Sequence, residues 1–343
     1  MELWPETRMK WTYVTHRLDT SHAARVVPIT ADAGPGSVVL ARVVSIGKHK
    51  DVEDSTGRRR MLFPGDYIVG ALGHRYATDQ YEGRGTATRT AGHLLGIGGV
   101  CGEVVSKNER MVDPTLIEWI GLVADESGRP LDLRQFALPR AHGFAPASAR
   151  TILSVGASMN AGKTTTAAQM IRTLTGEDMR VAAAKITGTA CRKDPGMMED
   201  AGAVRVLDFT DCGHASTAHC SADDLIAIAM DLRAALLTER PDYLVYEIAD
   251  GVFQRETRIL LEDPGFHSTI DAVLFAGPDS LACESGVRLL RGYGYNVVAT
   301  AGIVANSRLG MEETSFATGL PCLNGEMILN GRLRSALSVS WAA

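Results

Sequence analysis

The sequence predicts an α/β protein in which a doubly wound, mostly parallel sheet is preceded by a small β-barrel or β-sandwich domain. Residues 24–110 contain short runs rich in valine, isoleucine and aromatic residues, separated by turns with glycine and proline. From residue 151 onward, apolar runs alternate with helix-like stretches, as in βαβ units. Residues 141–150 contain alanine, glycine, proline and serine and indicate a linker. We therefore expect a β-rich domain over 1–140 and an α/β domain over 151–343.

Composition limits the classes of partner. The chain has 343 residues, of which 45% are hydrophobic and 22% charged, as in an ordinary globular protein. The formal net charge of −5 gives no basic field, so we expect no nucleic acid and no membrane partner. No apolar run approaches the roughly 18 residues that span a bilayer, and the first residues lack an apolar signal segment. Six scattered cysteines form no disulfide framework, so we expect a cytoplasmic protein.

The first half is predicted to contain strands at "ARVVPI", "SVVLARVVSIG", "RRRMLF" and "DYIVGALG", separated by turns at "ADAGPG", "DSTG" and "PGD". "HLLGIGGVCGEVVS" predicts a further strand pair with glycine bends, and "PTLIEWIGLVAD" a short helix or strand. The stretch from Arg75 to Arg89 is polar and contains small residues. We expect it to form a long mobile loop that covers an active site.

In the second half, buried strands are predicted at "TILSVG", "RVAAAKI", "VRVLDF", "YLVYEIA", "AVLFAG" and "NVVATAGIVA". Helices are predicted at "KTTTAAQMIRTLTG", "ADDLIAIAMDLRAALLTER" and "SLACESGVRLLRGYG". Their alternation predicts a parallel sheet covered on both faces.

A phosphate-binding loop is predicted at "GASMNAGKTT", between the first of these strands and the first helix. The usual pattern is G-x-x-x-x-G-K-[ST]. Gly162, Lys163 and Thr164 fit its end, but Ala157 occupies the position of its first glycine and Gly156 lies one residue earlier. The helix start would direct backbone N–H groups at phosphate. The predicted nucleotide-binding residues are Gly156, Ala157, Ser158, Met159, Asn160, Ala161, Gly162, Lys163, Thr164 and Thr165.

Two residues of this loop have predicted chemical roles. Lys163 would bridge the β- and γ-phosphates, and the Thr164 hydroxyl would bind Mg²⁺. The strand before the loop and the helix after it are the context that such a loop requires.

The spacing of a glycine, five residues and then Gly-Lys-Thr resembles dethiobiotin synthetase and its relatives. Two stretches that follow in the same order add to this resemblance. In "VAAAKITGTACRKD", Lys185 matches a lysine on the substrate side of the family's site. In "GMMEDAGAVRVL", Asp200 matches the family's second metal-associated acid, with Glu199 as the adjacent alternative.

Two later stretches also match in order. In "YLVYEIADGVF", Glu247 matches the glutamate that ends a strand beside the phosphate loop. In "AGIVANSRLG", Asn306 matches an asparagine that contacts adenine. The resemblance implies ATP and Mg²⁺ as cofactors, with Thr164, Asp200 and Glu247 around the metal. It also implies catalytic roles for Lys163 and Lys185, and a homodimer.

The resemblance covers roughly residues 151–330, and the departures from it bear on the reaction. Family members often carry acids where this chain has Ser158 and Asn160, and dethiobiotin synthetase has no counterpart of the first domain. We therefore do not expect biotin synthesis. The leading hypothesis is an ATP- and Mg²⁺-dependent enzyme that activates a small anionic substrate, a carboxylate by preference, through phosphoryl transfer, as related ligases do.

Other functions stay open at this point. They are a partitioning-type regulatory ATPase, a kinase of a small molecule or a nucleic-acid end, and an acyltransferase on a related scaffold. "DCGHASTAHC" also brings together Cys212, His214, His219 and Cys220. These are zinc-binding residue types, but their spacing matches no common zinc finger, and a loop between βα units is the other interpretation.

Overall fold

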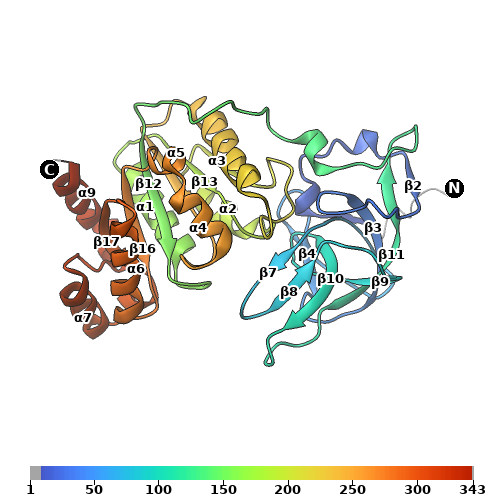
Figure 1. Cartoon of the computed structure of the whole chain (residues 1–343), viewed down its shortest axis with the longest axis horizontal. Coiled ribbons are helices and arrows are strands. Elements are labelled where there is room, and N and C mark those ends of the chain that lie inside the picture. Colours follow the sequence, from blue (N-terminus) through green and yellow to red (C-terminus); the bar gives the residue numbers. More distant parts are fainter. Residues whose placement is uncertain (1–8, 342–343) are drawn as a thin grey trace. The chain divides into compact units, whose positions relative to one another are not determined.

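The computed structural model describes residues 9–341 and divides into two compact units. Unit 1 contains the chain up to Leu138 and two later segments, 189–193 and 209–219. Unit 2 contains 139–188, 194–208 and the chain from Cys220 onward. The predicted fold class is confirmed: a mostly antiparallel β-domain precedes a parallel α/β sheet (Figure 1).

Unit 1 is built on a nine-stranded sheet whose pairings close into a ring. Five strands form that ring in the order β6, β3, β11, β9 and β10, because β10 also pairs with β6. Four of the five contacts are antiparallel, and the β10–β6 contact is parallel. The strands of this ring are β3 (Val38–Ser45), β6 (Tyr67–Leu72), β9 (Ala91–Leu94), β10 (Val100–Lys107) and β11 (Thr115–Ala124).

The remaining strands of unit 1 extend the ring or lie beside it. β1 pairs with β6, β2 pairs with β11, and β8 joins β10 to β7. β4 and β5 form a separate hairpin. Their bounds are β1 (Met9–Trp11), β2 (Arg25–Val27), β4 (Asp51–Glu53), β5 (Arg59–Met61), β7 (Arg75–Tyr76) and β8 (Tyr81–Arg84).

Side chains on both faces of the ring are buried. Along β3, Val39 and Ala41 belong to one apolar cluster, whereas Val38 and Leu40 belong to the other. This follows from the two-residue period of a strand, which sends successive side chains to opposite faces. The second cluster also contains residues of the later segments, so these segments complete the core of unit 1. They contribute Ala190 and Ala215.

Part of the predicted loop from Arg75 to Arg89 is instead the β7–β8 hairpin. Tyr81 anchors it, because its side chain is fully buried and its hydroxyl donates to the Val112 carbonyl over 2.5 Å. Arg75 also donates to the Gln80 side chain across the turn. The polar composition of the stretch predicted a mobile loop, because it did not indicate that Tyr81 would be buried.

Unit 2 contains a six-stranded parallel sheet in the order β14-β13-β15-β12-β16-β17 (Figure 1). Five of the strands have buried interiors, as expected for a sheet with helices on both faces, whereas Val206 of the edge strand β14 is half-buried. The strands are β12 (Arg150–Gly156), β13 (Val181–Lys185), β14 (Arg205–Asp208), β15 (Tyr243–Glu247), β16 (Ala272–Ala276) and β17 (Val297–Ala301).

The helices of this half follow the strands in alternation. They are α1 (Lys163–Thr175), α2 (Lys193–Asp200), α3 (Ala222–Leu237), α4 (Arg255–Glu262), α5 (Pro264–His267), α6 (Ser280–Gly292), α7 (Arg308–Thr318), α8 (Gly325–Met327) and α9 (Leu333–Trp341). No described helix has both the length and the apolar composition needed to cross a bilayer.

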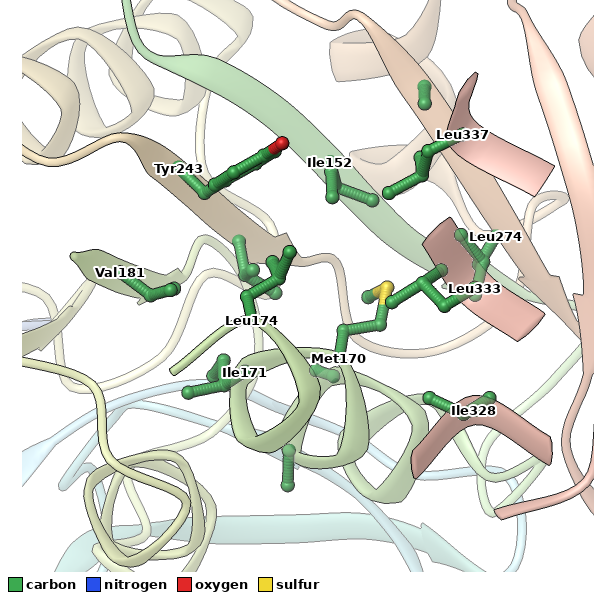
Figure 2. Packing of buried hydrophobic residues seen from close by; sticks show 14 of the residues in the cluster. Ile152, Met170, Ile171, Leu174, Val181, Tyr243, Leu274, Ile328, Leu333 and Leu337 are labelled. Atoms are coloured by element: carbon green, nitrogen blue, oxygen red, sulfur yellow. The ribbon is translucent and has the colours of Figure 1, made fainter. Parts of the chain in front are cut away.

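The core of unit 2 packs α1 against the centre of the sheet. Met170, Ile171 and Leu174 of α1 are fully buried in one cluster with Ile152 of β12 and Leu333 of α9 (Figure 2). The spacing of these α1 residues creates an apolar stripe on one helix face. The stripe fixes the start of α1, and therefore the phosphate loop, at the carboxyl edge of the strands.

Candidate nucleotide and phosphate site

The loop between β12 and α1 is held by close backbone packing. A side chain at Gly156 would place its Cβ 2.4 Å from the Ala276 carbonyl oxygen, whereas Ala157 is accommodated and its N–H donates to that oxygen over 2.9 Å. The shifted glycine therefore has a steric cause. Gly162 and Asn160 have left-handed φ angles of 103° and 61°, which glycine and asparagine adopt most readily.

Lys163 begins α1 and folds back over the loop. Its ammonium donates to the Ser158 carbonyl over 2.7 Å, and the residue is only 5% exposed. Burial lowers the pKa of the Lys163 amine, and the carboxylates of Glu247 and Asp250 oppose this shift. The Lys163 ammonium is therefore held beside the loop backbone, where the charges of Glu247 and Asp250 stabilise it.

Thr164 and Glu247 come into direct contact, because β12 and β15 are neighbours and Ser154 pairs with Glu247 in register. The Thr164 hydroxyl donates to Glu247 Oε1 over 2.7 Å. Glu247 Oε2 is buried and has no hydrogen-bond partner in the described part of the chain. Burial raises the pKa of the Glu247 carboxyl, and the Lys185 ammonium opposes that shift. The arrangement leaves one buried carboxylate oxygen beside a hydroxyl.

Lys185 ends β13 and pairs in register with Glu247 on β15. The residue is 7% exposed, and its ammonium forms an ion pair with Asp194 in the first turn of α2. The structure thus brings Lys163, Thr164, Lys185 and Glu247 to the same edge of the sheet.

Asp200 lies at the opposite end of α2 from Asp194, and its side chain is exposed, as is that of Glu199. The two aspartates are six positions apart in the helix, which is about 9 Å along the helix axis. Sequence reasoning did not single out Asp194. The available signal was its position one residue after a lysine at the start of a helix, which is a common place for an acid.

The segment after β15 packs against the phosphate loop. Val252 N–H donates to the Gly156 carbonyl over 3.0 Å. A Cβ at Gly251 would lie 2.2 Å from the Ala157 carbonyl oxygen, so this close approach requires glycine. Asp250 precedes it in the left-handed region, with φ 60°. Non-glycine residues in this region are concentrated at functional sites.

A pocket of about 150 Å³ adjoins the start of α1. Its lining includes Asn306, the residue predicted to contact adenine, together with Gly162 and Thr165 of the loop region. Two further amide side chains that sequence reasoning missed, Gln169 and Asn324, also line it. A cavity of about this volume in another protein's core binds benzene, so the space suits an aromatic ring.

Glycines make this pocket by allowing backbone segments to meet. A Cβ at Gly302, whose φ is 95°, would lie 2.2 Å from the Ala161 carbonyl oxygen. Ile303 N–H donates to that same oxygen over 3.2 Å. The segment after β17 is therefore fixed directly to the phosphate loop.

The cysteines and histidines of "DCGHASTAHC" do not form a metal centre in the part of the chain that the structure describes, where no group of three or more His, Cys, Asp or Glu side chains is placed to hold an ion. His219 instead contacts Arg84, whose guanidinium lies 2.7 Å from its Nε2. Cys212 is buried.

The strand order, the loop after β12 and the helix that follows define a P-loop NTPase fold. Comparison with protein-family models gives no match, and comparison with curated protein sequences gives none either.

Solved structures similar to this chain include three proteins of low identity. A signal recognition particle 54 kDa protein from Aeropyrum pernix, in complex with GDP, is 19% identical over 57% of this chain and 50% of that one, with a TM-score of 0.38. A DUF1611 family protein from Anabaena variabilis is 17% identical over 61% and 63%, with a TM-score of 0.41. A ParA family ATPase from Chlorobium tepidum is 13% identical over 56% and 96%, with a TM-score of 0.33. The chain thus spans half the length of the first protein and 63% of the second.

Proposed function

We propose that the protein transfers a phosphoryl group from a nucleoside triphosphate, ATP by expectation, to a small anionic substrate such as a carboxylate. The contact between Thr164 and Glu247, directly after a loop closed by Lys163, is the observation that carries the proposal. A hydroxyl at a helix start, a buried carboxylate and a lysine are the groups that phosphoryl transfer requires at one place.

The residues present fit a magnesium ion. Thr164 and Glu247 supply hard oxygen ligands, which Mg²⁺ prefers. The buried Glu247 Oε2 lacks a hydrogen-bond partner among the described residues, and coordination of a bound cation would compensate for this. When bound, Mg²⁺ neutralises charge on the phosphates. Asp194 is our candidate for the second acid, because it approaches the same edge through Lys185, whereas Asp200 was the residue expected from sequence.

The chain's own residues divide the remaining work. The backbone N–H groups of 158–163 would bind phosphate oxygens at the positive end of α1. Lys163 would exchange the Ser158 carbonyl for the phosphates. Lys185 would orient the anionic substrate by exchanging its ion pair with Asp194 for the substrate's charge. Each exchange replaces an existing partner with a ligand oxygen, so no buried cation is left unpaired.

The test is calorimetric binding of ATP in the presence of Mg²⁺ to the full chain. Lys163→Ala should weaken binding at least tenfold, because it removes a charge-assisted contact worth about 1.5–3 kcal/mol. Arg172→Ala, an exposed cation on the same helix, serves as the matched control and should bind as the wild type does. Equal affinity of wild type and Lys163→Ala would remove the proposal.

A partitioning-type regulatory ATPase is the second candidate, and it requires a nucleotide-dependent homodimer. Leu309 and Phe316 on α7 are 77% and 92% exposed, which favours a subunit contact there. Sedimentation with and without ATP separates the two functions. Dimerisation only with ATP, without stimulation of turnover by any small carboxylate, would favour the regulatory ATPase.

A further inference from the structure

The pocket beside the phosphate loop presents amides as its long polar side chains. Three of them, Gln169, Asn306 and Asn324, line it together with the backbone of Gly302 and Gly325. No aspartate or glutamate belongs to its lining in the described part of the chain. The side chains of the pocket therefore offer both hydrogen-bond donors and acceptors, without a fixed charge.

The three amide side chains differ in whether their hydrogen-bonding groups are available to a ligand. Asn324 Oδ1 accepts the Met327 N–H over 2.9 Å, so this residue already caps a helix start. Gln169 projects from α1 against Gly325, where an added Cβ would lie 2.3 Å from its Nε2. Asn306 is exposed at the end of the segment after β17. Gln169 can therefore occupy this position only because residue 325 has no side chain, and Asn306 is accessible to a ligand.

We propose that Gln169 acts with Asn306 to select adenine over guanine in the nucleotide of this site, an inference that rests on the proposed function. An amide offers one acceptor and two donors. This matches the adenine edge, where an exocyclic amine lies beside a ring nitrogen acceptor. Guanine and hypoxanthine instead present an acceptor, O6, beside a donor, N1–H, which is the reverse of the order in adenine. An amide held in the orientation that suits adenine therefore faces acceptor with acceptor and donor with donor. Guanine also carries the N2 amine beside N1–H, and these two donors need paired acceptors such as the two oxygens of a carboxylate. The pocket lining supplies no such carboxylate.

Gly325 contributes to this selection because it leaves space for the Gln169 side chain. Alanine at 325 would meet the Gln169 amide and force it to another rotamer. The change alters no group that can bond to a base. Loss of selectivity in Gly325→Ala would therefore report the placement of Gln169 rather than the chemistry of a new side chain.

The experiment measures the dissociation constants of ATP, GTP and ITP for the full chain by calorimetry with Mg²⁺. Wild type should bind ATP at least about fivefold more tightly than GTP or ITP, the smallest effect expected of one bidentate amide–base pair. Gln169→Glu should reduce the ATP-to-GTP ratio about tenfold, and Gly325→Ala should reduce it in the same direction. Arg172→Ala, on the same helix but outside the pocket lining, should leave the ratio unchanged.

Equal binding of ATP and GTP by wild type would overturn the selection by Gln169 while leaving the phosphate site intact. A ratio unchanged in both Gln169→Glu and Gly325→Ala, with both variants folded by circular dichroism, would overturn it as well. Absence of binding by all three nucleotides would overturn the proposed function and this inference together.

Discussion

The structure and the sequence favour different aspartates, at opposite ends of α2, as the second acid of the site. Asp194 pairs with the buried Lys185, whereas Asp200 is exposed. We expect Asp194→Asn to weaken Mg²⁺-dependent ATP binding or turnover about tenfold, because it changes the charge beside Lys185 and Glu247. Asp200→Asn, which makes the same chemical change, should alter either quantity less than about twofold. Calorimetry and a phosphate-release assay measure both. A larger effect of Asp200→Asn would return the second acid to the position expected from sequence.

His49 makes the stability of unit 1 depend on pH. Burial is the main reason that the pKa of His49 falls from 6.5 to about 4, with a further contribution from the Arg75 charge. Its folded-state pKa is lower than its unfolded-state value, so the stabilisation is complete above pH 6.5 and is lost as the pH falls toward 4. Between pH 7 and pH 5 this should cost about 2 kcal/mol.

Urea unfolding at pH 7 and pH 5 measures this loss. His49→Gln, which keeps a donor toward the Leu94 carbonyl, should lose less stability over the same interval. His142→Gln, at an exposed histidine, should behave as the wild type does. An identical loss in all three proteins would show that His49 is not the group that titrates.

At the scale of elements, the segment after β17 depends on glycine. Gly302 and Gly319 both have left-handed φ angles, of 95° and 68°, but only Gly302 has an atom near its absent Cβ. Gly302→Ala should therefore push the segment away from Ala161 and weaken ATP binding at least tenfold. Gly319→Ala carries backbone strain of the same kind without the clash, and should change stability but not affinity. Calorimetry and thermal unfolding distinguish the two effects, and equal affinities for both variants would contradict this account.

The elements of unit 2 could be predicted because their information is local. The apolar runs and the α1 stripe of Ala167, Met170, Ile171 and Leu174 follow the periods of buried strands and of a helix that packs on them. The phosphate loop was found from its motif, and Thr164 and Glu247 were both named as metal-site residues. Their contact depends on strand order, which places β15 beside β12. Strand order cannot be read from periodicity, and for the same reason Gln169 and Asp194 were missed.

At the scale of the whole molecule, the two compact units are not continuous stretches of the sequence. Segments 189–193 and 209–219 belong to unit 1, although they interrupt the α/β half. Ala190 N–H donates to the Ala215 carbonyl over 3.0 Å, and Arg192 N–H donates to the buried Glu53 carboxylate over 2.6 Å. In sequence, these segments of small residues cannot be told from an ordinary surface loop. Only their long-range partners show that Ala190 and Ala215 are core residues.

Removal of residues 1–138 tests this division. The remaining chain should still bind ATP, because Lys163, Thr164, Glu247 and Asn306 all belong to unit 2. Its segments 189–193 and 209–219 should become sensitive to protease, because their buried side chains Ala190 and Ala215 lose the core that covers them. Limited proteolysis with mass spectrometry compares the truncated and full chains. Equal protection of both segments in the two proteins would show that unit 1 does not hold them.

The central claim is that Thr164 and Glu247 hold the cation of a nucleoside triphosphate site. The most direct measurement is a crystal structure of the full chain with Mg²⁺ and a non-hydrolysable ATP analogue. The account predicts a cation bound by the Thr164 hydroxyl, with the Glu247 carboxylate contacting it directly or through one water, and Lys163 moved from the Ser158 carbonyl to the phosphates. A cation more than about 8 Å from both Thr164 and Glu247, beyond water-bridged coordination, would contradict it.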